Sequence, residues 1–415
     1  RYPLVTGVQT CALPILPLEP ALNRMGSLRS SLFRDFDEAK EAWRSLEKTS
    51  DHYPFQTWAW LDAWYRTIGL AHGWSPAILF LEREARRGEG SKLQRAALPL
   101  GICGKPPFRR LAWMGEGVSD YHGPLIGSVR GEDEGSKDLF GTEALLSEIR
   151  GLAEKLDCGV IDLNRNPEGF NFLKNPLAGA GFARLHYKSH SLRLPESTEG
   201  FLKERFGAKE RYNLRRAAKR LSELGRLDFK VAVDEKSRTI LTERMIALKR
   251  ERYKVIGAKD NFADPSFREF YREAATTADL DVHISGLFLN GQAIALHWGI
   301  KDDSTMYYLM PAFAAGPLRQ YSPGLVFLLE FIDQCRSEGL ETLDFTIGDE
   351  EYKRKWCTDE MNLFKFYEGR GVAGGALAVL KTTGDWIRLS PLQKPISRLR
   401  SQARKLLFKD DRIAD

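Results

Sequence analysis

The stretch 344–356 gathers side chains that can move protons or hold an anion. Its candidate groups are Asp344, Asp349, Glu350, Glu351, Tyr352 and Lys353. Tyr352 could deliver a proton or position an acceptor, and Lys353 could face a phosphate or an oxyanion. Asp349, Glu350 and Glu351 are candidate bases if burial raises a pKa. The alternative is a solvated helix face on which Lys353 and its basic neighbours pair with these acids.

His297 lies in "IALHWGI", a predicted central strand. Its imidazole could act as a general base. A histidine in a strand can equally be a core residue whose ring nitrogens are hydrogen bonded. The sequence leaves both interpretations open.

The stretch "RQYSPG" (319–324) has the features of an anion site. We expect the preceding strand to end at Met310, because Pro311 cannot donate to a ladder. A helix should then begin with Ser322 as its N-cap and Pro323 in its first turn. The free N–H groups at such a helix end suit an anionic ligand. The Ser322 hydroxyl could cap the helix and so compete for the same amides.

The elements that must position these groups form two similar series. The first series predicts helices at 33–48 and 57–69, strands at 76–83, 96–104 and 109–117, a helix at 141–159 and a strand at 160–164. The second predicts helices at 207–225 and 237–255, a three-strand meander at 283–313 with an Asn-Gly turn at 290–291, a helix at 323–339 and a strand at 340–348. Each series ends on a strand that contains an aspartate, Asp162 or Asp344. The order predicts an internal structural repeat.

Two motifs resemble a known superfamily. "RQYSPG" resembles the (R/Q)xxGx(G/A) acetyl-coenzyme A loop of the GNAT acetyltransferases, with Ser322 in place of the first glycine. The order of meander, loop, helix and strand is similar to that of a GNAT domain, in which two central strands splay to admit the pantetheine arm. The resemblance implies coenzyme contacts from Met310, Arg319, Gln320, Ser322 and Gly324.

The second motif, "DFTIGDEEYKRKW", resembles the ending of the CelD/BcsL-like acetyltransferases of bacterial cellulose and exopolysaccharide synthesis. These are similar to the FemABX transferases, which have two GNAT-like domains. The resemblance covers about 33–370 and implies an α/β (α+β) fold of two tandem GNAT-like domains, each a mixed sheet flanked by helices. We expect a leader at 1–24, domain 1 at 25–195 without a coenzyme site, a coenzyme-binding domain 2 at 196–372, and a basic tail at 373–415.

The activity implied by the resemblance is N-acyl transfer from acetyl-coenzyme A, without a metal, to an envelope or exopolysaccharide-related acceptor. Catalytic candidates are Tyr352, Lys353 and His297, and acceptor-binding candidates are Asp120, Tyr121, Asp344 and Asp349. In domain 1, "EGVSDYHGPL" stands where domain 2 has its coenzyme loop, but it lacks the RxxGxG pattern. It could therefore line an acceptor cleft between the domains, with His122 as a further contact, or be an ordered surface turn.

Two other functions stay open. One is FemABX-like aminoacyl transfer from a charged transfer RNA gripped by the basic helix at 208–225, whose cations could instead form a solvated face. The other is a non-catalytic scaffold for a polysaccharide synthase, with the splayed strands filled by Tyr307, Tyr308 and Met310.

Composition is that of an ordinary globular protein, with 43% hydrophobic and 28% charged residues in 415. No apolar run is long enough to span a bilayer. The five cysteines form no metal-binding spacing, which favours a reducing cytoplasm. The tail at 381–409 is basic and amphipathic but broken by prolines, so we expect a solvated tail with at most weak contact to a membrane surface.

The first residues, "RYPLVTGVQTCALPI", match neither an export signal nor a helix or strand. The run 5–15 can be back-translated to a common short-read sequencing adapter. We therefore interpret about the first 16 residues as an assembly scar that packs against little, with Met25 as a plausible start.

Overall fold

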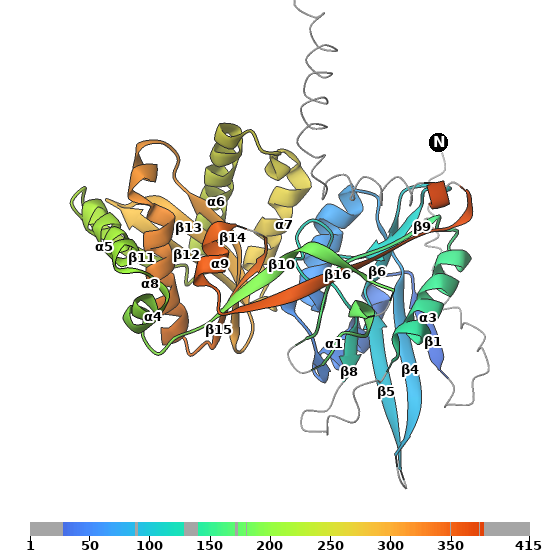
Figure 1. Ribbon diagram of the computed structural model, residues 1–415. Helices are drawn as coiled ribbons and strands as arrows, with labels where there is room; N and C mark the ends of the chain where they lie inside the picture. Colours follow the sequence, from blue (N-terminus) through green and yellow to red (C-terminus); the bar gives the residue numbers. More distant parts are fainter. Residues whose placement is uncertain are drawn as a thin grey trace, which may run out of the picture.

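The chain forms two α/β halves that lie side by side and are joined by one long sheet (Figure 1). The computed structural model describes residues 28–87, 90–127, 140–170, 173–179, 181–348, 350–372 and 374–376. The predictions for the leader at 1–24, for Asp349 and for nearly all of the tail at 373–415 lie outside these residues.

The first half begins with short helices and two antiparallel hairpins. Its elements are β1 (Arg29–Phe33), α1 (Lys40–Glu47), β2 (Ser50–Asp51), α2 (Trp58–Trp64), β3 (Ser75–Pro76), β4 (Ile78–Arg87), β5 (Gly90–Leu98), β6 (Leu100–Cys103), β7 (Arg110–Trp113), β8 (Leu125–Gly127), α3 (Thr142–Lys155), β9 (Val160–Pro167) and β10 (Ala183–Arg193). Five of these strands form a separate sheet in the order β1-β4-β5-β8-β2.

The second half contains the predicted meander and the helix that follows it. Its elements are α4 (Thr198–Arg205), α5 (Ala208–Ser222), β11 (Leu227–Val231), α6 (Glu235–Ile256), α7 (Pro265–Thr276), β12 (Val282–Leu289), β13 (Gln292–Lys301), β14 (Thr305–Phe313), the 3-10 helix η7 (Gly316–Tyr321), α8 (Pro323–Ser337), β15 (Thr342–Ile347), α9 (Glu351–Trp356) and β16 (Asp359–Gly369). The Asn-Gly turn is confirmed, since Asn290 and Gly291 both have positive φ between paired strands.

The predicted internal repeat is confirmed by the strand pairing. In each half an antiparallel strand is followed by a crossover through a helix to a parallel neighbour, β7 with β9 and β14 with β15. Both parallel ladders are short. The last pairs are Ala112 with Asp162 and Tyr307 with Asp344. The two strands of each pair therefore separate at equivalent aspartates.

The halves exchange strands. The long sheet has the order β11-β12-β13-β14-β15-β10-β16-β9-β7-β6-β3 in the described part of the chain. Strand β10 of the first half pairs with β15 of the second, and the late strand β16 returns to pair with β9 of the first. Figure 1 shows β10 and β16 crossing the middle of the molecule together.

The two halves also share one hydrophobic core. Aromatic rings from the first half meet rings from the second, with Trp60 and Phe270 at a 5.0 Å centroid distance and Phe55 and Tyr307 at 5.6 Å. Helix α2 packs on α7 at this junction. A shared apolar core of this kind favours a fixed relation between the halves over free domain motion.

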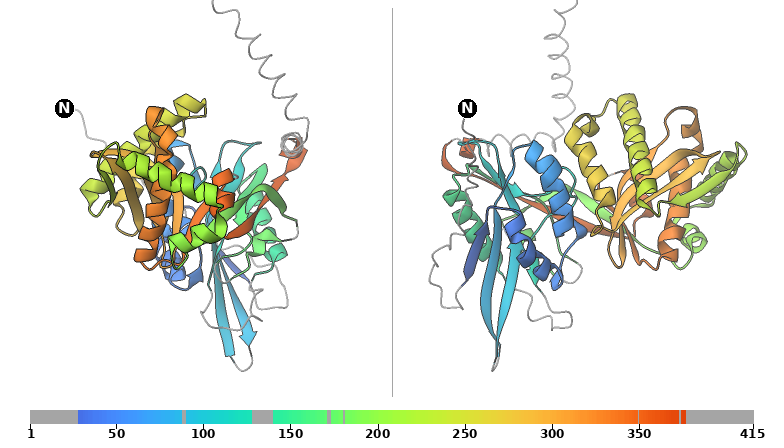
Figure 2. Two further views of the ribbon diagram at one scale, coloured as in Figure 1. Left: turned by 60° about the vertical axis from the view of Figure 1, so that its left-hand side comes forward. Right: turned by 180° about the vertical axis from the view of Figure 1, so that it is seen from behind.

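Helices cover both faces of the second-half sheet. Helix α8 lies against β12, β13 and β14 on one face, and α5 packs on α8. Helix α6 covers the opposite face beside α7, as the view from behind shows (Figure 2). Among the described residues, no helix combines the length and apolar character that crossing a membrane requires.

The predicted end of the strand at Met310 is wrong, because β14 continues to Phe313 and Pro311 pairs with His297 of β13. The physical reason is that β14 has lost its other neighbour there. Its described ladder with β15 stops at Tyr307, so Pro311 occupies a one-sided strand, where a missing N–H is tolerated.

Candidate active site between the two halves

Asp344 lies where β14 and β15 separate, and side chains from both halves contact it. Its carboxylate is 7% exposed. The Tyr121 hydroxyl, from the first half, lies 2.9 Å from both Oδ1 and Oδ2, and the backbone N–H of Thr346 donates to Oδ1 at 2.7 Å. The structure thus brings together two residues that the sequence named separately as acceptor contacts.

The backbone after Asp344 is bent to make this contact. Thr346 has a φ of 59°, in the left-handed region that a β-branched residue rarely adopts. The register of the neighbouring strand β10 shifts at the same place, between His190 and Ser191. Such a conformation costs on the order of 1–3 kcal/mol and is frequent at functional sites.

Burial raises the pKa of Asp344 to about 7. The hydrogen bonds from the Thr346 amide and the Tyr121 hydroxyl oppose this rise, as does the charge of Lys353, while the charge of Asp120 adds to it. A carboxyl group whose pKa lies near neutral pH can both accept and release a proton under physiological conditions.

Asp120, the residue before Tyr121, is a second acid close enough for its charge to act on Asp344. Burial raises its pKa, against the charge of Arg165 and a hydrogen bond with the Thr346 side chain. Arg165 Nη1 lies 3.4 Å from Asp120 Oδ1 and donates to the carbonyl oxygen of Ser119 at 2.7 Å. Arg165 therefore holds the loop in place and provides a positive charge beside Asp120.

The loop that carries these residues is tied to the first-half core. The indole of Trp60 donates to Ser119 Oγ at 2.9 Å, and Gln56 Nε2 donates to the Tyr121 carbonyl at 3.1 Å. The Tyr121 ring packs on Tyr53 at a centroid distance of 4.6 Å. These contacts hold the Tyr121 hydroxyl in place before any ligand arrives.

Two lysines of the second half are buried on the side of α9, and the charge of Lys353 acts on both Asp344 and Asp120. Lys353 is 5% exposed, and its Nζ donates to the Ile347 carbonyl at 2.6 Å and lies 3.2 Å from Glu350 Oε2. On α6, burial lowers the pKa of Lys249 to about 8, and the charge of Arg252 adds to the effect. The Lys353 ammonium group thus binds the end of β15 and the residue that precedes α9.

His297 lies on the opposite face of the sheet from Asp344. It is fully buried and stacks on Tyr308 at 4.5 Å, beneath Phe331 of α8. Burial holds the pKa of His297 well below its ordinary value, with a further contribution from His283. Its imidazole is neutral and enclosed under α8. It is therefore not among the groups that surround Asp344.

His122 also lies apart from Asp344. Its Nδ1 is 2.9 Å from the Asn164 carbonyl oxygen, and burial lowers its pKa to about 3. Its ring is therefore neutral and belongs to the interior of the first half.

Tyr352 approaches the separated strands from α9. Its ring packs edge-on against Phe345 at 6.1 Å, on the face of β15 opposite to Asp344, where Phe345 also meets Tyr308. Burial raises the pKa of Tyr352, the charge of Glu350 raises it further, and Arg252 opposes this. The phenol keeps its proton at neutral pH and can act as a donor.

The predicted coenzyme loop forms η7 and the start of α8. The expectation that the Ser322 hydroxyl caps the helix is wrong: Ser322 is the N-cap residue but makes no side-chain capping bond. Its φ of 50° places it in the left-handed region, whereas side-chain capping requires an extended N-cap residue. Arg319 and Gln320 are exposed on η7.

Gly324 is required by packing at this point. A Cβ at residue 324 would lie 2.6 Å from the ring of Phe313 on β14. Met310, on the same strand, is partly buried and packs against the core shared by the halves. The start of α8 thus lies against the end of β14.

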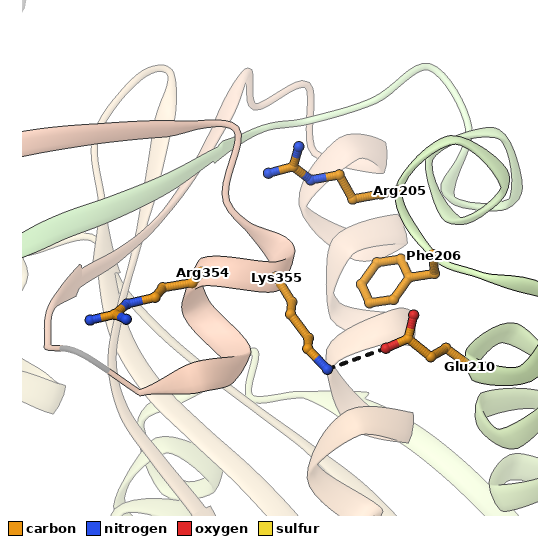
Figure 3. Close-up of a pocket in the computed structure, with 5 residues that line it drawn as sticks. All are labelled: Arg205, Phe206, Glu210, Arg354 and Lys355. Carbon is orange, nitrogen blue, oxygen red and sulfur yellow. Dashed lines mark hydrogen bonds and ion pairs between the residues drawn. The ribbon is translucent and has the colours of Figure 1, made fainter.

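A separate basic pocket lies between α9 and the helices α4 and α5 (Figure 3). It has a volume of about 280 Å³, and its lining residues are Arg205, Phe206, Glu210, Arg354 and Lys355. Lys355 Nζ lies 3.2 Å from Glu210 Oε1, so part of its positive charge is already paired.

The contacts identify residues that the sequence analysis missed. Tyr53 and Thr346 contact the predicted pair Tyr121 and Asp344, and Arg165 holds the loop that carries Tyr121. Nothing in their local sequence distinguishes them, because their role depends on strand pairing and on the packing of one half against the other.

Comparison with known protein families identifies one domain. Residues 208–354 match the family model of an acetyltransferase (GNAT) domain. This confirms that the second half contains a GNAT-type domain, as predicted for an acyltransferase. No curated protein matches the chain.

Solved structures with a similar arrangement are distant in sequence. The C-terminal domain of a putative lysylphosphatidylglycerol synthetase from Agrobacterium fabrum has a TM-score of 0.48 at 13% identity, covering 84% of this chain and 97% of that one. FemX has a TM-score of 0.46 at 13% identity, with coverages of 78% and 95%. A tandem GNAT protein from the clavulanic acid pathway has a TM-score of 0.44 at 12% identity, with coverages of 83% and 99%. Likenesses this distant say nothing about donor or acceptor.

Proposed function

We propose that the protein is an N-acyltransferase that takes an acyl group from acetyl-coenzyme A and gives it to an amine in the cleft between the halves. The acceptor class that we favour is a small envelope or exopolysaccharide-related molecule, as in the CelD/BcsL-like enzymes that the sequence resembles. The observation that carries the proposal is Asp344, a buried acid with a pKa of about 7 at the parting of β14 and β15.

The residues around the coenzyme loop fit an anionic donor by charge. Arg319 is exposed on η7, and the N-terminus of α8 presents its positive dipole end beside it. Arg220 of α5 lies over the ring of Tyr321 at 4.8 Å, so a further cation stands next to the loop. Arg319 and the α8 terminus would hold the diphosphate, and the bound thioester would supply the acyl group.

The side chains of this protein then have distinct tasks. Asp344 accepts the proton of the acceptor amine on its carboxylate, which Tyr121 and Thr346 hold in one orientation. Tyr352, protonated at neutral pH, donates a proton to the leaving thiolate. Asp120, in the same cleft, offers a second acid that attracts a cationic acceptor.

Calorimetric titration with acetyl-coenzyme A tests the donor. We expect binding to the wild-type protein, about tenfold weaker binding to Arg319→Ala, and unchanged binding to Arg29→Ala, a matched exposed arginine on β1. Release of free thiol with a panel of amino sugars then tests turnover. No heat with the wild-type protein, or equal binding by both variants, would contradict the donor assignment.

A second candidate donor is a charged transfer RNA, which the basic helix α5 favours. This helix packs against η7 and α8, and Lys209, Arg216 and Lys219 on it are exposed. Electrostatic binding of RNA would fall steeply between about 50 and 200 mM salt. Binding of acetyl-coenzyme A should change far less over that range, so the salt dependence separates the two donors.

A further inference from the structure

Three metal-ligating side chains meet where the exchanged strands cross. His190 lies on β10, Glu360 on β16, and Cys357 directly after α9. One ligand atom from each lies within 4.8 Å of the other two. His190 Nδ1 and Glu360 Oε1 are 3.5 Å apart, which is close to the separation of two ligands on one metal ion.

Strand pairing and hydrogen bonds to the backbone hold the three residues of this cluster in place. His190 and Glu360 are direct partners in the β10–β16 ladder. The N–H of Cys357 donates to the Lys353 carbonyl at 2.8 Å, and Arg205 Nη2 donates to the Cys357 carbonyl at 2.6 Å. His190 is 1% and Cys357 4% exposed, so two of the three donors lie in the interior.

Neighbouring side chains also orient the donors. Lys188 Nζ lies 2.6 Å from Glu360 Oε2, which leaves Oε1 on the side of His190. The Cys357 thiol has one weak contact, to the Arg354 carbonyl at 3.6 Å. Outer contacts that aim a ligating carboxylate are typical of built metal sites.

We propose that His190, Cys357 and Glu360 bind a zinc ion. A sulfur, an imidazole nitrogen and a carboxylate oxygen form the mixed donor set that Zn²⁺ accepts in tetrahedral coordination, and a water molecule would complete it. The expectation of no metal rested on spacing along the chain, whereas strand exchange brings these residues together. The ion would tie β10 to β16 and to the end of α9, the helix that carries Tyr352 and Lys353.

The test uses the full chain after removal of metal by a chelator. We expect it to bind one equivalent of Zn²⁺, measured by competition with a chromophoric chelator, and to unfold at a higher temperature with zinc present. Co²⁺ in place of Zn²⁺ should give a thiolate-to-cobalt charge-transfer band. Cys357→Ser should abolish the band, and Cys103→Ser, a partly buried cysteine of the first half, should retain it.

Glu360→Gln covers the case in which Cys357→Ser does not fold. The Glu360 side chain is 37% exposed, so this variant should keep its near-ultraviolet dichroism while binding zinc at least tenfold more weakly. The proposal is overturned if the wild-type chain binds no stoichiometric zinc, which would leave the cluster as an ion pair beside a thiol. It is also overturned if the cobalt band persists in a folded Cys357→Ser variant.

Discussion

The two halves place an aspartate at the same point of the same strand arrangement and surround it differently. Asp162 ends the parallel ladder of β7 and β9, and Asp344 ends that of β14 and β15. Arg110 Nη1 lies 3.2 Å from Asp162 Oδ2, and its other nitrogen pairs with Glu116. Asp344 is held by a tyrosine hydroxyl and a backbone amide instead.

Under the proposed mechanism, this difference separates a structural acid from a reactive one. Arg110 pairs with Asp162, and Trp113, the next residue of β7 after the ladder ends, is buried, with its indole donating to Asn166 Oδ1 at 3.1 Å. In the second half, Tyr352 packs against Phe345, the residue after Asp344. The first half also contributes Tyr121 to the surroundings of Asp344, from the loop that corresponds to the predicted coenzyme loop of the second.

The largest expected effect is on turnover. Asp344→Asn removes the proposed proton acceptor and should lower kcat about 1,000-fold, within the range of general-base catalysis. Asp162→Asn, the matched change in the first half, should leave kcat within about threefold. Thiol release is measured on both variants. Equal impairment of the two would contradict a difference in role between Asp344 and Asp162.

The second prediction concerns stability as a function of pH. Because burial raises the pKa of Asp344 to about 7, its contribution to stability is greatest below the ordinary pKa of an aspartate and is lost as pH rises through 7. The loss amounts to about 4 kcal/mol. Asp344→Asn should therefore gain stability relative to wild type between about pH 4 and pH 8. Urea unfolding of both proteins at these pH values measures the difference, and parallel curves would count against a raised pKa.

The third prediction sharpens the role of the first half. The Tyr121 hydroxyl lowers the pKa of Asp344 by donating to it, so Tyr121→Phe should move the acidic limb of the kcat profile to higher pH. The rate at neutral pH should fall about tenfold, equivalent to one hydrogen bond to a charged group. Tyr53→Phe leaves the hydrogen bond between Tyr121 and Asp344 in place and serves as the control. A shift in both variants would assign the effect to packing.

The smallest effect is expected in the first half. Arg110→Leu removes the cation beside Asp162 and should lower the free energy of unfolding by about 1–3 kcal/mol. Asp162 would then resemble Asp344, so stability should also begin to fall as pH rises. Chemical denaturation at two pH values measures both changes. Unaltered stability would show that Arg110 does not neutralise Asp162.

Local sequence signals predicted much of the second half but not the exchange of strands. The Asn-Gly turn and the Ser-Pro-Gly start of α8 carry their own backbone preferences, so the meander and helix could be expected. Strands β10 and β16 were not predicted, although "MNLFKFY" alternates in a strand-like way. Their partners lie in the opposite half, and no local pattern encodes that choice.

The site shows the same limit. Tyr121 and Asp344 were both named from the sequence, but their contact depends on how the halves pack. Thr346 and Pro311 adopt conformations that local preference argues against, because the parting of β14 from β15 changes what each position requires.

Carboxyl-carbon NMR of the protein labelled at aspartate Cγ tests the central claim most directly, since it needs neither donor nor acceptor. The resonance absent from Asp344→Asn identifies Asp344. It should titrate with a midpoint near 7 in the wild-type protein and higher in Tyr121→Phe. A midpoint near 4, the ordinary value for an aspartate, would contradict the assignment of Asp344 as the group that exchanges protons at neutral pH.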